Sequence, residues 1–139
     1  MQIIGHRIKK VSGQRHDVEE GTTLSGIKTN AEPTGIREGK SDDSKNKVLI
    51  VDWRLTSDYN LTNEKKLADL EIAGEIIIAM ESKEFKKTME DWKKNKRMEK
   101  DQLIPILQGI LNVAQVEAII LARELNLPSP VQLIKIKEN

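Results

Sequence analysis

The chain has 139 residues, charged side chains at 32% of its positions, and a formal net charge of +1. This length predicts one ordinary domain, and the balanced charge gives no general attraction to nucleic acid or to a membrane surface. There is no cysteine and there are two histidines, which excludes a disulfide framework and leaves too few ligands for a tetrahedral zinc site.

The first third of the chain, residues 1–47, predicts irregular strands and a flexible loop. The strand-like pieces QIIGHRIKKV, TTLSGIKT and TGIRE are separated by Gly, Asn and Pro33. The apolar run at the N-terminus is only two residues long, too short for a signal peptide, so we expect a soluble, cytoplasmic protein.

Residues 35–41, Gly-Ile-Arg-Glu-Gly-Lys-Ser, are similar to a phosphate-binding loop. Three residues separate the two glycines, one fewer than that motif requires, and the polar stretch that follows lacks the apolar periodicity of a helix. We therefore interpret residues 34–47 as a loop without a nucleotide site.

Residues 48–80 predict the core strands of an antiparallel sheet with one buried face. On the predicted buried face lie Leu49, Val51, Trp53, Leu55, Leu70, Ile72, Ile76, Ile78 and Met80. Gly74 shares this face, where its missing side chain leaves room for a helix or a bulge. Asp69, Glu71 and Glu75 occupy the opposite face.

Residues 83–100 are rich in lysine and contain Phe85, Met89 and Trp92 at the i, i+4, i+7 spacing of one apolar helix stripe. Two interpretations are open. The lysines are the solvated face of an amphipathic helix, or they grip phosphates while Trp92 stacks on a base. Interrupting acidic residues favour the first.

The helices predicted over residues 83–127 end with a segment that is apolar around more than half of its circumference. Its apolar part, ILNVAQVEAIILA, is interrupted by Asn112, Gln115 and Glu117 and is too short to span a bilayer. Such a helix needs two surfaces to pack on, its own sheet and a second subunit or an apolar ligand. Pro128 and Pro130 end it, and residues 128–139 predict an extended C-terminus.

Several of these residues, in this order, resemble the SecB family of protein-export chaperones over roughly residues 45–136. The matching positions are residues 74–79 (GEIIIA), Val116, Ile120, residues 122–124 (ARE), Leu127, Pro128 and Leu133. The resemblance implies an α+β fold in which a four-stranded antiparallel Greek-key or meander sheet precedes C-terminal helices packed on one face. It also implies a homodimer, or a dimer of dimers, that acts as an ATP-independent holdase without catalytic residues or cofactors.

The resemblance places an unfolded client in apolar grooves between sheet and helix. We expect client contacts from Trp53, Leu55, Ile76, Ile78, Trp92, Leu107 and Leu111. We expect subunit contacts from Val116, Ile119, Ile120 and Arg123. Asp69, Glu71 and Glu75 could form the acidic face that in this family engages a translocation motor.

The chain departs from that family in its balanced charge. We also expect it to lack the acidic C-terminal tail through which the family engages the motor. Alternatives to an export chaperone are therefore a chaperone dedicated to a toxin–antitoxin pair, and a nucleic-acid or regulatory binding protein that uses residues 83–100. We do not expect an enzyme, because the sequence shows no arrangement of a nucleophile with a general base.

Overall fold

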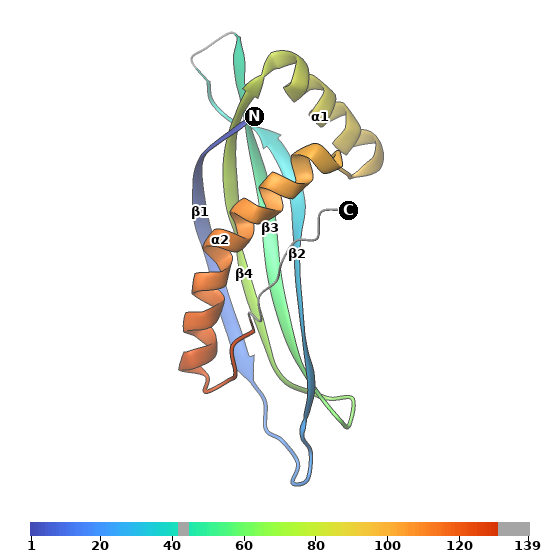
Figure 1. Cartoon of the computed structure of the whole chain (residues 1–139), viewed down its shortest axis with the longest axis vertical. Helices are drawn as coiled ribbons and strands as arrows, with labels where there is room; N and C mark the ends of the chain where they lie inside the picture. The colour runs from blue at the N-terminus through green and yellow to red at the C-terminus, as the bar shows by residue number, and fades with distance from the viewer. Residues whose placement is uncertain (42–44, 131–139) are drawn as a thin grey trace.

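A computed structural model of the chain describes residues 1–41 and 45–130, and the ribbon is shown in Figure 1. Four strands come first and two helices follow. In chain order the elements are β1 (Gln2–Arg15), β2 (Leu24–Glu38), β3 (Asn46–Leu61), β4 (Lys66–Glu81), α1 (Ser82–Asn95) and α2 (Lys100–Glu124).

The strands form one antiparallel sheet in the order β1-β4-β3-β2. Strands β2, β3 and β4 are consecutive hairpin neighbours, and β1 returns to pair with β4, which is a Greek-key arrangement. In Figure 1, α2 runs obliquely across the sheet and α1 lies near the end where β4 finishes. The predicted α+β fold, four antiparallel strands followed by helices, is confirmed.

Strands β3 and β4 carry the core because their apolar side chains alternate along each strand. In the observed register Val51 pairs with Ile76 and Leu49 with Ile78, and all nine apolar side chains expected on the inner face are buried. The alternation therefore predicted the buried face correctly.

Strands β1 and β2 are longer and more regular than the sequence suggested. They span 14 and 15 residues, and residues 34–38, interpreted as part of a loop, belong to β2. Both are edge strands with mostly exposed side chains, so the apolar alternation is weak. Each also has two register shifts, and every shift of one residue reverses the face on which later side chains lie.

One of these shifts lies opposite Gly74. Ile8 pairs with Gly74 and Lys10 with Ala73, so Lys9 is the additional residue of a bulge. A Cβ atom at Gly74 would collide with the carbonyl oxygen of Arg7 and would lie 2.8 Å from the Trp53 ring. The expected role of Gly74, leaving room on the apolar face, is confirmed, and β1 and the indole use that room.

Helix α2 packs one side on the sheet. Its buried residues are Ile106, Ile110, Leu111, Ala114, Ala118 and Ala122. Within the described part of the chain it is the one helix whose length and hydropathy match a membrane-crossing segment, contrary to the expectation that this region is too short. A helix that packs one face on a sheet can have the same composition.

The C-terminal end of α2 is attached to β1, and its start is attached to α1. At its C-terminal end, Arg15 donates hydrogen bonds to the carbonyl oxygens of Leu125 and Asn126 at 2.9 and 2.8 Å. These carbonyls have no partner inside a helix, so a cation there is favourable. Near its start, Gln102 belongs to a polar network that includes the N-terminal residue of the chain.

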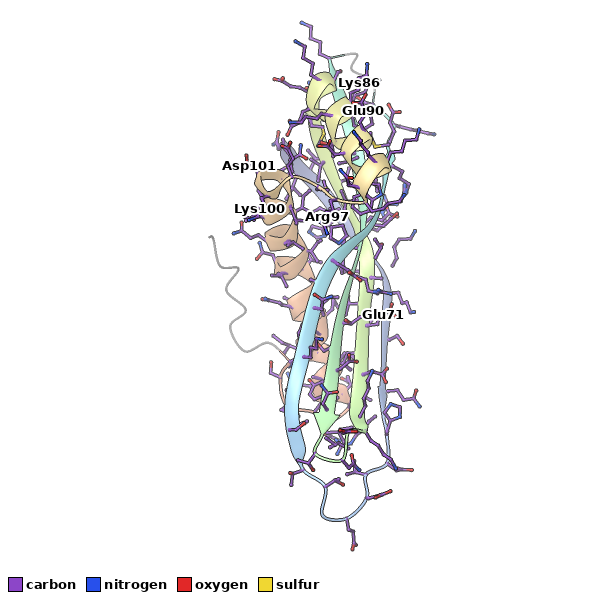
Figure 2. The ribbon with its side chains drawn as sticks, turned by 90° about the vertical axis from the view of Figure 1, so that its right-hand side faces the viewer. Glu71, Lys86, Glu90, Arg97, Lys100 and Asp101 are labelled. Atoms are coloured by element: carbon purple, nitrogen blue, oxygen red, sulfur yellow. The ribbon has the colours of Figure 1, made fainter. Side chains whose placement is uncertain are left out.

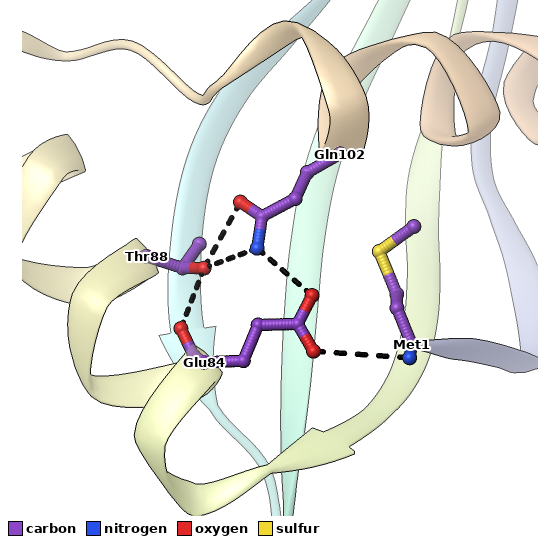
Figure 3. A network of polar contacts seen from close by, with 4 residues as sticks. All are labelled: Met1, Glu84, Thr88 and Gln102. Carbon is purple, nitrogen blue, oxygen red and sulfur yellow. Dashed lines mark hydrogen bonds and ion pairs between the residues drawn. The ribbon is translucent and has the colours of Figure 1, made fainter.

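That network ties α1, α2 and the N-terminus together (Figure 3). The Gln102 amide donates to the Glu84 carboxylate at 3.1 Å and to the Thr88 hydroxyl at 2.8 Å. Glu84 also lies 3.8 Å from the amino group of Met1. Because Thr88 is 1% exposed, these bonds satisfy polar groups that burial would otherwise leave without partners.

After α2 the chain crosses back over the sheet as far as Pro130. Leu127 joins a second apolar cluster with Tyr59, Ala68, Leu70 and Ala122. Of the predicted extended segment 128–139, residues 131–139 lie outside the described residues.

Candidate functional site

A groove of about 860 Å³ lies between α1 and the edge strand β2. Its lining comes from β2, from Lys47 of β3, from α1 and from Lys96, which follows α1. The lining residues are Thr34, Gly35, Ile36, Glu38, Lys47, Ser82, Phe85, Lys86, Met89, Glu90, Trp92, Lys93 and Lys96.

The apolar part of the groove consists of Ile36, Phe85, Met89 and Trp92. These side chains pack against the main core cluster, but each keeps part of its surface exposed. The three residues of α1 lie at the spacing of one helix stripe, so the helix presents them together. The groove therefore offers apolar contact area that the chain covers only in part.

Strand β2 supplies the other wall. Within the described sheet it is an outermost strand, paired with β3 on one side only. Alternate main-chain N–H and C=O groups of such a strand point away from the sheet, where an added extended segment can bind them. Pro33, without an N–H group, and the bulge at Thr34 lie at one end of the groove wall.

The rim of the groove carries four lysines and two glutamates. Lys47 lies 3.5 Å from Glu38. Among the described residues, Lys86, Lys93 and Lys96 lie within ion-pair distance of no carboxylate. Lys86 and Glu90 lie along α1 in Figure 2. The rim thus has an excess of positive charge.

The structure places the residues expected to contact a client in two environments. Trp92 lines the groove, and Leu107 is half-buried and packs on the core. The other five are buried in the core between sheet and helices, with exposures of 0–7%: Trp53, Leu55, Ile76, Ile78 and Leu111. In this conformation those five side chains contact the chain's own core, so the groove does not include them.

Sequence reasoning missed Ile36, Phe85 and Met89 as groove residues. The apolar stripe of α1 is visible in the sequence, but it predicts only that one side of the helix is covered. That β2, an edge strand, would lie beside this stripe depends on the tertiary arrangement. The position of Ile36 was also difficult to predict, because residues 35–41 resemble a phosphate-binding loop and were interpreted as part of a loop, not of a strand.

The residues expected at a subunit interface lie together on the outward side of α2. Val116, Ile119 and Ile120 are 55%, 38% and 48% exposed, and Arg123 is exposed one turn further along. Val11 on β1, an edge strand that contacts α2, is 46% exposed. The other side of α2 packs on the sheet, so these apolar side chains are left without cover by the described residues.

The three carboxylates of the predicted acidic face lie on the outer face of the sheet, each beside a base. Asp69 lies 3.0 Å from His16, and Glu71 (Figure 2) lies 2.7 Å from Lys10. Glu75 is 4% exposed and lies 3.1 Å from Lys9 and 3.0 Å from Arg37. Hydrogen bonding to Lys9, and then to Arg37, lowers the pKa of Glu75. Each carboxylate of this face therefore has a basic partner within the fold, and the face is not an unpaired acidic surface.

The features of the groove are suited to binding an extended ligand. It offers apolar area, the edge of β2 and ammonium groups. No group of three or more histidine and carboxylate side chains suited to a metal ion is found in residues 1–41 and 45–130.

No protein-family model matches the sequence, and no curated protein matches it. A solved structure with a similar fold is the SecB-like chaperone Rv1957 of Mycobacterium tuberculosis, in complex with a ChAD peptide from the Rv1956 HigA1 antitoxin. The similarity has a TM-score of 0.50 and covers 99% of this chain and 91% of that chain, at 15% sequence identity. The chain has a SecB-like fold. The resemblance seen in the sequence is confirmed at the level of the fold.

Proposed function

We propose that this SecB-like protein is an ATP-independent holdase chaperone that binds extended, apolar segments of unfolded polypeptides in the groove between α1 and β2. The observation that carries this proposal is the partly exposed stripe of Phe85, Met89 and Trp92 beside an edge strand. Such a site binds the two features that unfolded chains share, apolar side chains and free main-chain groups.

Binding through burial of apolar surface requires no chemical reaction. Apolar burial contributes roughly 25 cal/mol per Å², so a few client side chains in the groove suffice for micromolar holding. The SecB-like chaperone of similar fold is complexed with a peptide, which supports a polypeptide as the ligand.

A second candidate is a narrower form of the same function, a chaperone dedicated to the antitoxin of a toxin–antitoxin pair. It is favoured by the antitoxin peptide in the structure of similar fold. An export function that delivers clients to a translocation motor has no comparable observation in its favour.

The proposed holdase is a homo-oligomer, dimeric or a dimer of dimers. Its subunits would be joined through Val116, Ile119, Ile120 and Arg123. This assembly would cover the apolar side of α2 that the sheet leaves exposed.

The test is suppression of aggregation of several unrelated unfolded clients, without ATP, while tryptophan emission is followed. We expect emission to change on client addition because Trp92 lines the groove, and we expect the change to disappear in Trp92→Phe. Met89→Asp should weaken holding with little loss of cooperative unfolding, because Met89 is only partly buried. Unchanged aggregation of all clients at a molar excess of this protein would contradict the proposal.

A further inference from the structure

The charge around the groove indicates which clients it prefers. We propose that the groove selects apolar segments flanked by Asp or Glu over equally apolar segments flanked by neutral or basic residues. This inference rests on the proposed chaperone function and adds the chemical class of the preferred client.

Three lysines that line the groove carry positive charge without an ion-pair partner among the described residues. Lys86, Lys93 and Lys96 line the groove, and the described residues place no carboxylate within ion-pair distance of them. Lys87, outside the lining of the groove, lies 2.7 Å from Glu99. Helix α1 therefore has an ion-paired lysine outside the groove and two lysines, Lys86 and Lys93, on the groove side, and Lys96 follows directly after the helix.

The sheet surface provides a second comparison. Lys10, Arg54 and Lys66 lie at 2.7, 2.8 and 3.1 Å from Glu71, Glu32 and Asp58. Their charges are balanced within the fold, so a ligand gains little there. The groove rim is different because a client carboxylate would meet ammonium groups that still lack an ion-pair partner in the described chain.

Lysine side chains lay their aliphatic stems along apolar surfaces and keep the ammonium group in water. Lysines beside Phe85, Met89 and Trp92 therefore extend the apolar walls and place charge at the rim. In an extended client, successive side chains point to opposite sides. Apolar residues can thus enter the groove while acidic neighbours remain at the rim.

The mixed rim favours a polypeptide over a nucleic acid. Glu38 and Glu90 also line the groove, and they would repel a continuous row of phosphates. A peptide with one or two carboxylates can meet the lysines and avoid both glutamates. The partly exposed apolar side chains match client side chains better than they match a sugar–phosphate backbone.

The test uses three peptides without tryptophan that share one apolar core and differ in their flanks, which are Glu, Gln or Lys. Binding is followed by the emission of Trp92 in the full chain, at two salt concentrations. We expect the Glu-flanked peptide to bind about five- to tenfold more tightly than the Gln-flanked one, with the Lys-flanked peptide weakest. The difference should shrink as salt screens the rim charges.

A pair of double variants isolates the rim. Lys86→Glu with Lys93→Glu should abolish or invert the order of the three peptides. Lys83→Glu with Lys94→Glu changes the net charge of the same helix equally, but neither residue lines the groove. This control should retain the order, so an equal effect of both variants would contradict a local role of the rim.

The outcomes separate the two proposals. If aggregation is suppressed but the three peptides bind equally, the acidic preference is wrong and the chaperone function stands. If no peptide binds and aggregation proceeds unchanged, both are wrong. If a single-stranded oligonucleotide displaces the Glu-flanked peptide and itself changes Trp92 emission, the groove is a nucleic-acid site and the client preference is wrong.

Discussion

The hydroxyl group of Tyr59 donates a hydrogen bond of 2.6 Å to the carbonyl oxygen of Pro128, 69 residues further along the chain. The contact fixes the segment after α2 against β3. Tyr59 is 0% exposed, and burial raises its pKa to about 12 from an ordinary value of 10.0.

This relationship predicts a loss of stability at alkaline pH. The folded chain retains the phenolic proton between about pH 10 and 12, whereas the unfolded chain releases it, so unfolding becomes more favourable as pH rises through that window. Tyr59→Phe should cost about 1 kcal/mol at neutral pH and should flatten the decline. Denaturant unfolding of both proteins from pH 8 to 12 measures this, and parallel curves would contradict it.

Gly74 should tolerate no side chain. In Gly74→Ala the new methyl group meets the Arg7 carbonyl and the Trp53 ring, so we expect a loss of about 1–3 kcal/mol in the free energy of unfolding. Gly26→Ala on β2 is the control, because no atom lies within 4 Å of its added Cβ. Denaturant unfolding compares the two, and an equally small effect at both sites would show that β1 moves aside freely.

The buried carboxylate of Glu75 should contribute more to the free energy of unfolding than that of Glu71, which lies on the same face of the sheet. Glu75→Gln removes the charge that Lys9 and Arg37 bind and should cost about 1–3 kcal/mol. Because the folded-state pKa of Glu75 is lowered, its contribution is present above the unfolded pKa and is lost as pH falls through the folded value.

The matched control for that change is Glu71→Gln, four residues earlier on β4. Glu71 is more exposed and has one partner, Lys10, so its loss should stay within about 1 kcal/mol. The measurement is urea unfolding at pH 7 and again at pH 3, where the difference between Glu75→Gln and the unmutated chain should narrow. Equal losses at both positions would mean that burial of Glu75 adds nothing.

The two sides of α2 should respond oppositely to a carboxylate. Ile110 is 1% exposed, so Ile110→Asp should cost several kcal/mol and unfold the chain. Ile120 is 48% exposed, so Ile120→Asp should leave subunit stability almost unchanged but weaken the proposed self-association. Light scattering and thermal unfolding separate these effects. A monomeric unmutated protein at high concentration would rule out the interface.

The inner face of the sheet could be predicted from the sequence because β3 and β4 lie in the middle of the sheet, where apolar residues recur at nearly every second position and form the buried face. The lengths of β1 and β2 could not, since their bulges break the alternation and none of their side chains is fully buried. For the same reason, the groove could be predicted only from its α1 side. Ile36 and the edge of β2 lie beside that helix through pairings far apart in the sequence.

Trp53 illustrates a different limit. Its alternation with Leu49, Val51 and Leu55 correctly placed it on the apolar face, but alternation does not distinguish a core residue from a client-binding one. The helices cover Trp53 completely, and its buried Nε1 has no hydrogen-bond partner among the described residues. Only the path of α1 and α2 over the sheet decides between the two roles.

The order of the elements has a consequence for synthesis of the protein. Strand β1 emerges first, but its partner β4 comes last among the strands, with Gln2 opposite Ala79. The hairpins β2–β3 and β3–β4 can close earlier, because short loops join them. Both helices follow residue 81, so the apolar inner face stays uncovered until residues 82–124 have also been synthesised. During that interval a nascent copy displays the kind of extended apolar strand that finished copies are proposed to hold.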